Sequence, residues 1–144
     1  MLSNTSKYAI RAMIYLALNS KGEAKIGIKQ ISKDLEIPTP FLGKILQTLA
    51  KHKLLVSTKG PHGGFGLGKS AHDICLMDIV EIIDGLDSFQ MCALGLKSCT
   101  NNEQNCPIHH RYETIRDQLK NLFQEENIGA LADHIKESSS AVAL

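Results

Sequence analysis

The fold is decided by residues 54–69, whose sequence is LLVSTKGPHGGFGLGK. The first five of these residues have the composition of a β-strand, and a returning strand is expected around Phe65–Leu67. The glycines between the two strands allow a tight tip and a close approach of the backbone to a ligand. A phosphate-binding loop is disfavoured, because the Gly-x-x-x-x-Gly-Lys-Ser/Thr spacing and a following βα unit are missing. The segment therefore predicts a β-hairpin.

Two short helices are expected directly before this hairpin. In the first, Ile28, Ile31 and Leu35 recur at helical spacing, and Pro38 stops the helix. The second begins at Thr39-Pro40, since threonine can cap the free amides and proline suits the first helical position. Its buried face consists of Leu42, Ile45, Leu46 and Leu49. This pair is typical of a helix-turn-helix or of a plain packed hairpin of helices, and the β-hairpin that follows favours a winged helix-turn-helix.

A winged helix-turn-helix binds DNA with its second helix in the major groove. Lys44, Gln47 and Thr48 are expected to face that groove, with Lys44 reading guanine or holding a phosphate. The hairpin would reach the adjacent minor groove or its phosphates, where Lys59, His62 and Lys69 are available. The residues expected to contact DNA are Lys29, Thr39, Pro40, Gly43, Lys44, Gln47, Thr48, Lys51, Lys59, Gly60, Pro61, His62 and Gly63.

Charge is divided unevenly along the chain. Residues 1–70 hold eleven Lys and Arg against three Asp and Glu, a net charge of +8. Residues 71–144 hold five Lys and Arg against twelve Asp and Glu, a net charge of −7. A basic half joined to an acidic half is typical of a protein that binds a polyanion on one side. An enzyme is disfavoured, because the sequence shows no nucleophile–base pair and no paired carboxylates with a local signature.

Length and composition limit the class of protein. The 144 residues, 43% of them hydrophobic and 22% charged, are enough for one globular domain with a helical arm. The longest apolar runs are too short for a membrane-spanning helix, and the N-terminus does not resemble a signal peptide. We therefore expect no membrane association, a cytoplasmic location and reduced thiols.

The other helices are expected at 6–19, at 76–84, from Pro107 onward, and after Asn127, which would cap the last one. From Pro107 an apolar seam follows a heptad spacing, made of Ile108, Tyr112, Ile115, Leu119 and Leu122. Such a seam forms a dimer helix or packs on its own domain, and we favour a homodimer because a winged helix closes its own core. The predicted fold is thus mainly α with a small β-hairpin wing, plus a long C-terminal dimerisation helix.

Three cysteines stand at regular intervals in and after a segment without periodicity, residues 88–105. Six residues separate Cys92 from Cys99, and six separate Cys99 from Cys106. His109 and His110 follow closely, and either imidazole could join a metal site with the thiolates. Zinc sites usually contain short Cys-x2–4-Cys knuckles, whereas thiolates on a long loop suit an iron–sulfur cluster. A disulfide switch and three unconnected cysteines remain alternatives, and Cys75 is expected to be a buried thiol.

The whole sequence resembles the dimeric bacterial winged-helix regulators typified by IscR, NsrR and CymR. The resemblance is carried by Ser6–Met13, by Gln30–Pro38 with Phe41, Leu42, Ile45 and Leu46, by the hairpin Gly60–Leu67, and by the three cysteines. It implies a homodimeric regulator of transcription that binds a pseudo-palindromic DNA operator. The IscR arrangement implies ligation by Cys92, Cys99, Cys106 and His109 and a [2Fe-2S] cluster. The NsrR arrangement implies an acidic ligand near the N-terminus, where Ser6-Lys7-Tyr8 offers no carboxylate.

Some positions depart from this family pattern. The cysteine spacing is longer than the family's spacing of about five residues, Gly43 and Lys44 replace bulkier polar residues, and Lys59 replaces a common arginine. The resemblance divides the chain into a DNA-binding domain (1–85), a cysteine-containing cluster loop (86–106) and a dimerisation region (107–144). The expected function is a repressor that senses cluster status, iron, oxygen or nitric oxide. The alternatives are a cluster-free regulator that responds to thiol oxidation or to a protein partner, and a redox or electron-transfer protein.

Overall fold

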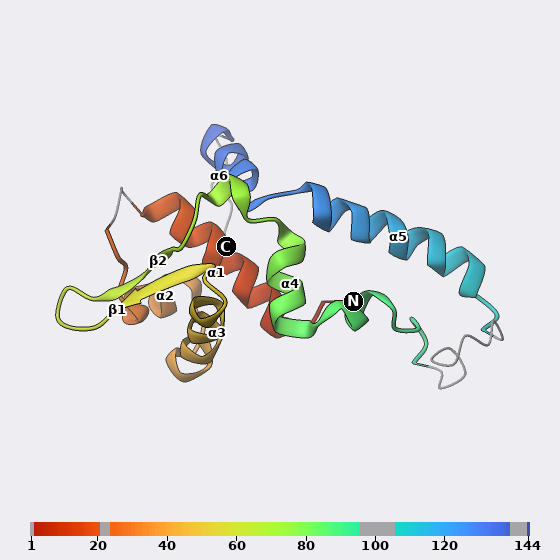
Figure 1. Ribbon diagram of the computed structural model, residues 1–144, viewed down its shortest axis with the longest axis horizontal. Coiled ribbons are helices and arrows are strands. Elements are labelled where there is room, and N and C mark those ends of the chain that lie inside the picture. Colours follow the sequence, from red (N-terminus) through yellow and green to blue (C-terminus); the bar gives the residue numbers. More distant parts are fainter. Residues whose placement is uncertain (1, 21–23, 96–105, 139–143) are drawn as a thin grey trace.

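The computed structural model describes residues 2–20, 24–95, 106–138 and 144. Its helices and strands run in the order α1 (Asn4–Asn19), α2 (Ile28–Leu35), α3 (Thr39–Lys51), β1 (Leu55–Thr58), β2 (Gly64–Leu67), α4 (Leu76–Asp84), α5 (His109–Glu125) and α6 (Ile128–Glu137). Two short 3₁₀ turns, η1 (Ala71–Asp73) and η2 (Leu86–Phe89), flank α4. The predicted mainly helical fold with a β-hairpin is confirmed (Figure 1).

Helix α1 lies at the centre of the core. Ala9, Ala12, Met13 and Leu16 are fully buried, because α2, α3, α4 and α6 all pack against this one helix. The two alanines leave room for close approach of the neighbouring helices. The helix begins earlier than its apolar stripe indicates, because the Ser3 side chain caps it by accepting from the Ser6 amide.

The wing is an antiparallel ladder with one addition that the sequence did not indicate. Strands β1 and β2 pair from Leu55↔Leu67 to Thr58↔Gly64. Ile26, which precedes α2, exchanges both backbone hydrogen bonds with Phe65, at N–O distances of 2.9 and 2.8 Å. Strand β2 is therefore paired on both of its edges, with β1 on one side and Ile26 on the other.

Gly64 is required where the wing meets Ile26. Its φ is +151°, and a Cβ atom built on it would lie 2.3 Å from the carbonyl oxygen of Ile26. We expect Gly64→Ala to lower the free energy of unfolding by about 2 kcal/mol or more, because backbone cannot move aside as a flexible side chain can. Urea unfolding measures this, with Gly27→Ala as the control. Nothing lies within 4 Å of a Cβ at Gly27. Equal effects of the two variants would contradict the close contact.

Helices α1 and α2 are joined by a buried phenol. The Tyr15 hydroxyl, on a residue only 8% exposed, donates to the Asp34 carboxylate at 2.5 Å. The Gln30 amide also donates to this carboxylate, at 2.8 Å. Burial, the hydrogen bond to Asp34 and the charge of Asp34 together raise the pKa of Tyr15 to about 12.

This raised pKa predicts a loss of stability at high pH. Tyr15 must be protonated to donate, so its contribution is complete below the unfolded pKa of about 10 and is lost as pH rises toward 12. At pH 8 we expect Tyr15→Phe to be less stable than the wild type. The difference should shrink between pH 10 and 12, as measured by urea unfolding. An Asp34→Asn background should reduce the difference at every pH, and a difference that grows with pH would refute the assignment.

Two predicted helix starts are wrong in detail. Thr39 does not cap α3, because Pro38 occupies the cap position and the Thr39 hydroxyl donates to the Ser32 hydroxyl at 2.9 Å. Pro107 is not the first residue of α5, which begins at His109 after a turn in which the His109 amide donates to the Cys106 carbonyl. Cys106 therefore lies before the helix and not on it.

Candidate functional site

The outward face of α3 is polar and basic. Leu42, Ile45, Leu46 and Leu49 are buried, as predicted, and fix the rotation of the helix on the core. The exposed residues of α3 are Pro40, Lys44, Gln47 and Lys51, together with the apolar Phe41, which is 39% exposed. Lys29 is exposed on α2. This face offers cations and an amide to a ligand without any backbone rearrangement.

Three other residues predicted to contact DNA lie at the edges of this face. Gly43 lies against α2, where a Cβ would be 3.3 Å from the Ile28 side chain. The half-buried Thr39 donates to Ser32, as described above, and Thr48 donates to the Lys44 carbonyl at 2.8 Å. The hydroxyl protons of both threonines are therefore used within the protein.

The tip of the wing extends from the body of the chain (Figure 1). Lys59, Gly60, Pro61 and His62 are exposed, and Gly63 is half-buried. The tip is closed by a hydrogen bond from the Gly63 amide to the Gly60 carbonyl, at 2.9 Å. Because β1 begins shortly after α3 ends and packs on it, the wing and the outward face of α3 belong to one packed unit.

Arg11 and Ser32 are two residues near this face with structural roles that the sequence did not predict. The Arg11 guanidinium donates to the carbonyl of Leu35, the last residue of α2, at 2.9 Å. It also lies 5.6 Å from the centre of the Tyr8 ring, which in turn makes an edge contact with Phe41. Neither the contacts of Arg11 nor the hydrogen bond between Ser32 and Thr39 has a local sequence signal, because both depend on how the helices cross.

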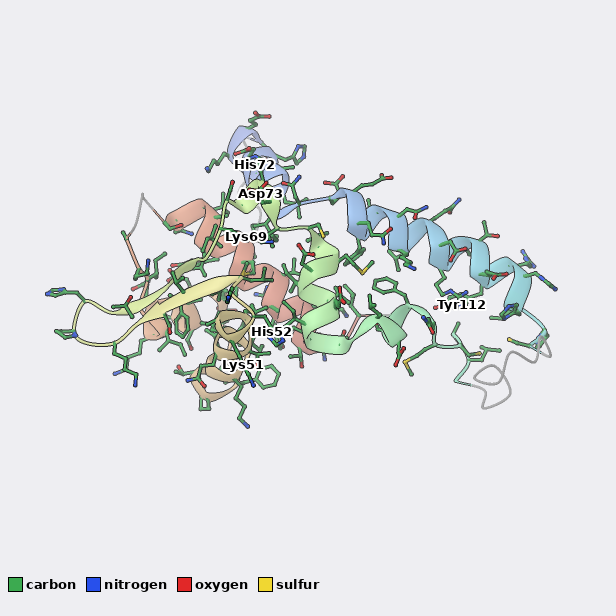
Figure 2. All side chains as sticks on the ribbon, viewed as in Figure 1. Lys51, His52, Lys69, His72, Asp73 and Tyr112 are labelled. Carbon is green, nitrogen blue, oxygen red and sulfur yellow. The ribbon has the colours of Figure 1, made fainter. Side chains whose placement is uncertain are left out.

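Helix α5 forms an arm that leaves the winged helix (Figure 1). Its predicted apolar seam divides into two sides. Tyr112 and Leu119 are half-buried and line a small cavity with Leu2 and Phe89. Figure 2 shows Tyr112 on the side of α5 that faces the segment of η2. Ile108, Ile115 and Leu122 are 36%, 60% and 48% exposed. These three residues, seven apart, form an apolar stripe that is exposed among the residues the structure describes.

The end of α5 nearest the winged helix is held by aromatic packing, and hydrogen bonds from Ser3 join the end of α4 to the start of α1. Phe123, which the heptad pattern misses, is buried against Phe89 with 5.8 Å between ring centres. Just before η2, the Asp84 carboxylate accepts from the Ser3 amide at 3.0 Å and from the Ser3 hydroxyl at 2.5 Å. The segment that leads to the cysteines is thereby connected both to α5 and to the start of α1.

Two of the three regularly spaced cysteines are close together. The sulfur atoms of Cys92 and Cys106 are 4.0 Å apart, with Cys106 only 7% exposed and Cys92 half-buried. Cys99 lies outside the described residues. Two thiolates bound to one tetrahedral metal at 2.3 Å would be about 3.8 Å apart, so the spacing of this pair fits a shared metal ion.

The histidines lie at the start of α5, beside Cys106. The side chain of His109 is 24% exposed, and its Nε2 atom is 3.9 Å from the Glu113 carboxylate. His110 is exposed, with its ring centre 5.8 Å from that of His109. No group of three or more metal-binding side chains is present within the part of the chain that the structure describes, which omits Cys99.

Cys75 is half-buried and not fully buried as predicted. It precedes α4, where its amide donates to the Asp78 carboxylate at 3.0 Å. Burial raises the pKa of its thiol above the ordinary range. A raised pKa keeps the thiol protonated and unreactive, which agrees with the structural role expected of it.

The chain is similar to one known protein family and to several proteins of known name. The Rrf2 family, described as iron-dependent transcriptional regulator, matches residues 2–134. A protein of Aquifex aeolicus, named as an HTH-type transcriptional regulator, is 35% identical over 129 residues, covering 89% of this chain and 88% of its own. The HTH-type transcriptional regulator IscR of Cronobacter sakazakii is 27% identical over 133 residues, covering 92% and 80%.

Solved structures with a similar fold include two named regulators. CymR, the global cysteine regulator of B. subtilis, has a TM-score of 0.75 and 22% identity, covering 93% of this chain and 97% of its own. The IscR of T. potens has a TM-score of 0.73 and 20% identity, covering 97% and 92%. These two likenesses concern the fold. In the described residues, no helix has the length and hydropathy needed to cross a membrane.

Proposed function

The chain belongs to the Rrf2 family of iron-dependent transcriptional regulators, and we propose that it is a cytoplasmic, homodimeric, DNA-binding repressor controlled by an iron–sulfur cluster. Membership of this family confirms a regulator of transcription and not an enzyme. The observation that carries the proposal is the surface formed by the exposed basic residues of α3 and the wing tip, joined by the packing of β1 on α3. The cluster and the dimer contact are proposed for a different part of the molecule, the cysteines and α5.

DNA binding would use the two parts of this surface for different tasks. Lys44 and Gln47 would reach base edges in the major groove, because they point directly away from the buried face of α3. Lys29, Lys51 and Lys59 would hold phosphates, and Pro61 and His62 at the wing tip would enter the minor groove. Gly43, Thr39 and Thr48 would shape the edges of the contact.

Homodimerisation would pair the exposed stripe of α5 with the same stripe of a second copy. Ile108, Ile115 and Leu122 repeat at the heptad interval that two packed helices require. Tyr112 and Leu119 would support the stripe from the inner side, against Phe89. A two-fold axis through α5 would present two winged units to a pseudo-palindromic operator.

The proposed ligands of the cluster are Cys92, Cys99, Cys106 and His109. The 4.0 Å between the sulfur atoms of Cys92 and Cys106, and the position of His109 just after Cys106, support this set. When bound, an iron–sulfur cluster, proposed as [2Fe-2S], supplies sensitivity to oxygen, nitric oxide and iron supply. Ligation would fix Cys92 and Cys106 relative to each other, and Phe89 and Asp84 would pass this change of position to α5 and α1.

One observation also favours a second candidate function. The same 4.0 Å between sulfur atoms is close enough for Cys92 and Cys106 to form a disulfide after a small movement. The chain would then be a cluster-free regulator that responds to thiol oxidation. Iron and sulfide contents of the anaerobically purified protein distinguish the two, since only the cluster regulator contains both.

A salt titration tests the DNA-binding proposal. If each protomer neutralises about four phosphates, the log–log slope of affinity against salt should be near −7. The probe is a duplex that the wild type enriches from a random library. Lys51→Ala and Lys59→Ala, which remove proposed phosphate contacts, should each flatten the slope by about 2 per dimer, and Lys120→Ala, an exposed lysine on α5, should leave it unchanged. Failure to enrich any duplex would refute DNA binding.

A further inference from the structure

The turn between α2 and α3 is held by an unusual concentration of hydrogen bonds on one residue. The Ser32 carbonyl accepts from the amide of Glu36 and, at 3.1 Å, from the amide of Ile37. The Ser32 hydroxyl donates to the Ile37 carbonyl at 2.6 Å and accepts from the Thr39 hydroxyl at 2.9 Å. Ser32 thus contacts the end of α2, the turn and the first residue of α3.

The backbone of this turn needs such support. Glu36 has φ +55°, a left-handed conformation that costs a residue with a side chain about 1 kcal/mol. No Gly or Asn, which tolerate this region better, occupies the position. Ile37 is fully buried beside it, so the chain reverses direction over a few residues while one side chain is fixed in the core.

The start of α3 also lacks the usual means of attachment. Its cap residue is Pro38, which has no side-chain acceptor for the free amides. Pro40 has no amide hydrogen. The hydrogen bond from Thr39 to Ser32 is the side-chain link that joins the first residue of α3 to α2. Because Pro40 and Lys44 lie within about one and a half turns of Thr39, a tilt at this point moves them directly.

From these contacts we infer that the Ser32 hydroxyl, through Thr39, sets the orientation of α3 and thereby the sequence specificity of DNA binding. This inference rests on the proposed function, since it assigns a positioning residue to that DNA surface. Specific contacts need base edges and side chains aligned closely, whereas phosphate contacts by flexible lysines tolerate a tilt of the helix. Loss of the hydroxyl should therefore reduce specific affinity much more than non-specific affinity.

The test compares two duplexes for each variant. One is the duplex that the wild type enriches from a random library, and the other is poly(dI-dC). We expect Ser32→Ala and Thr39→Val each to weaken binding to the enriched duplex about tenfold, the effect of one or two neutral hydrogen bonds, and to change binding to poly(dI-dC) less than twofold. Ser32→Thr, which keeps the hydroxyl, should bind as the wild type does. The double variant should be no weaker than the weaker single variant, since both remove one link.

Ser20→Ala is the matched control. The Ser20 hydroxyl also donates to a carbonyl at a helix end, that of Leu16, but it lies at the end of α1. Thermal unfolding checks that each variant is folded at the assay temperature. Equal weakening on both duplexes, or no weakening on either, would overturn the inference. A wild type that does not distinguish the enriched duplex from poly(dI-dC) would refute the proposed function itself, and the inference with it.

Discussion

Ile115→Asp is expected to convert the protein from a dimer to a monomer and to weaken binding to an enriched duplex by about a hundredfold or more. Ile115 is 60% exposed at the middle of the stripe formed with Ile108 and Leu122. In a symmetric pair of helices the central residue meets the partner near the two-fold axis, so one substitution would place two unpaired carboxylates in an apolar contact. Each protomer would then bind DNA with a single winged unit and lose the gain from joint binding.

Sedimentation equilibrium and the duplex titration measure these two effects together. Gln124→Asp is the control, because Gln124 is exposed on α5 and lies nine residues from Ile115, on the opposite side of the helix. Ile115→Asp should leave the thermal stability of the winged unit nearly unchanged, since the side chain is not in the core. A dimer that persists in Ile115→Asp would show that the stripe is not the dimer contact. A monomer that retains full affinity would show that dimerisation does not serve DNA binding.

Cys106→Ala is expected to abolish the iron and sulfide content of anaerobically purified protein. Cys106 is the most buried of the described cysteines, and its sulfur lies 4.0 Å from that of Cys92. A cluster that loses one of three thiolate ligands has no equivalent soft donor nearby among the described residues to replace it. His109→Ala should have a smaller effect on iron content than Cys106→Ala, since three thiolates would remain, and should shift the absorption spectrum of the cluster that is retained.

Cys75→Ala serves as the control for this measurement. Cys75 lies at the start of α4, and burial keeps its thiol protonated. The Cys75→Ala protein should have the same iron and sulfide content as the wild type. Unchanged iron in Cys92→Ala, Cys99→Ala and Cys106→Ala would refute the ligand assignment. Absence of iron in the wild type, together with a Cys92–Cys106 disulfide found by peptide mass spectrometry, would favour the thiol-based regulator.

The sequence predicted those elements whose cause is local. Helical spacing located α3 and its buried face, and glycine-rich composition located the wing, because each depends on neighbouring residues only. The Asn127 cap is confirmed for the same reason: its side chain accepts from the Ala130 amide. The spacing of apolar residues likewise predicted helices α1 and α4.

Features that depend on distant parts of the chain were not predictable in this way. The pairing of Ile26 with Phe65 joins segments separated by two helices, and Ser32 and Thr39 meet only after the turn is formed. The same reason explains the error at Thr39, whose hydroxyl is a good cap by local rules but finds a partner on the preceding helix. The heptad pattern of α5 located a row of apolar residues but could not divide it, since Tyr112 and Leu119 face Phe89 only because η2 packs there.

The cysteine end of α5 and the tip of the wing lie at opposite ends of the long axis of the chain (Figure 1). Helix α5 alone, with 17 residues, spans about 25 Å. Screening by salt reduces the field of an exposed charge over about 8 Å under physiological conditions. A change of charge at the cysteines is therefore not felt as an electric field at the phosphates bound by the same protomer. It must arrive as a displacement passed from one packed side chain to the next, so the stiffness of the joint at Phe89 and Phe123 sets how much of the signal reaches the DNA.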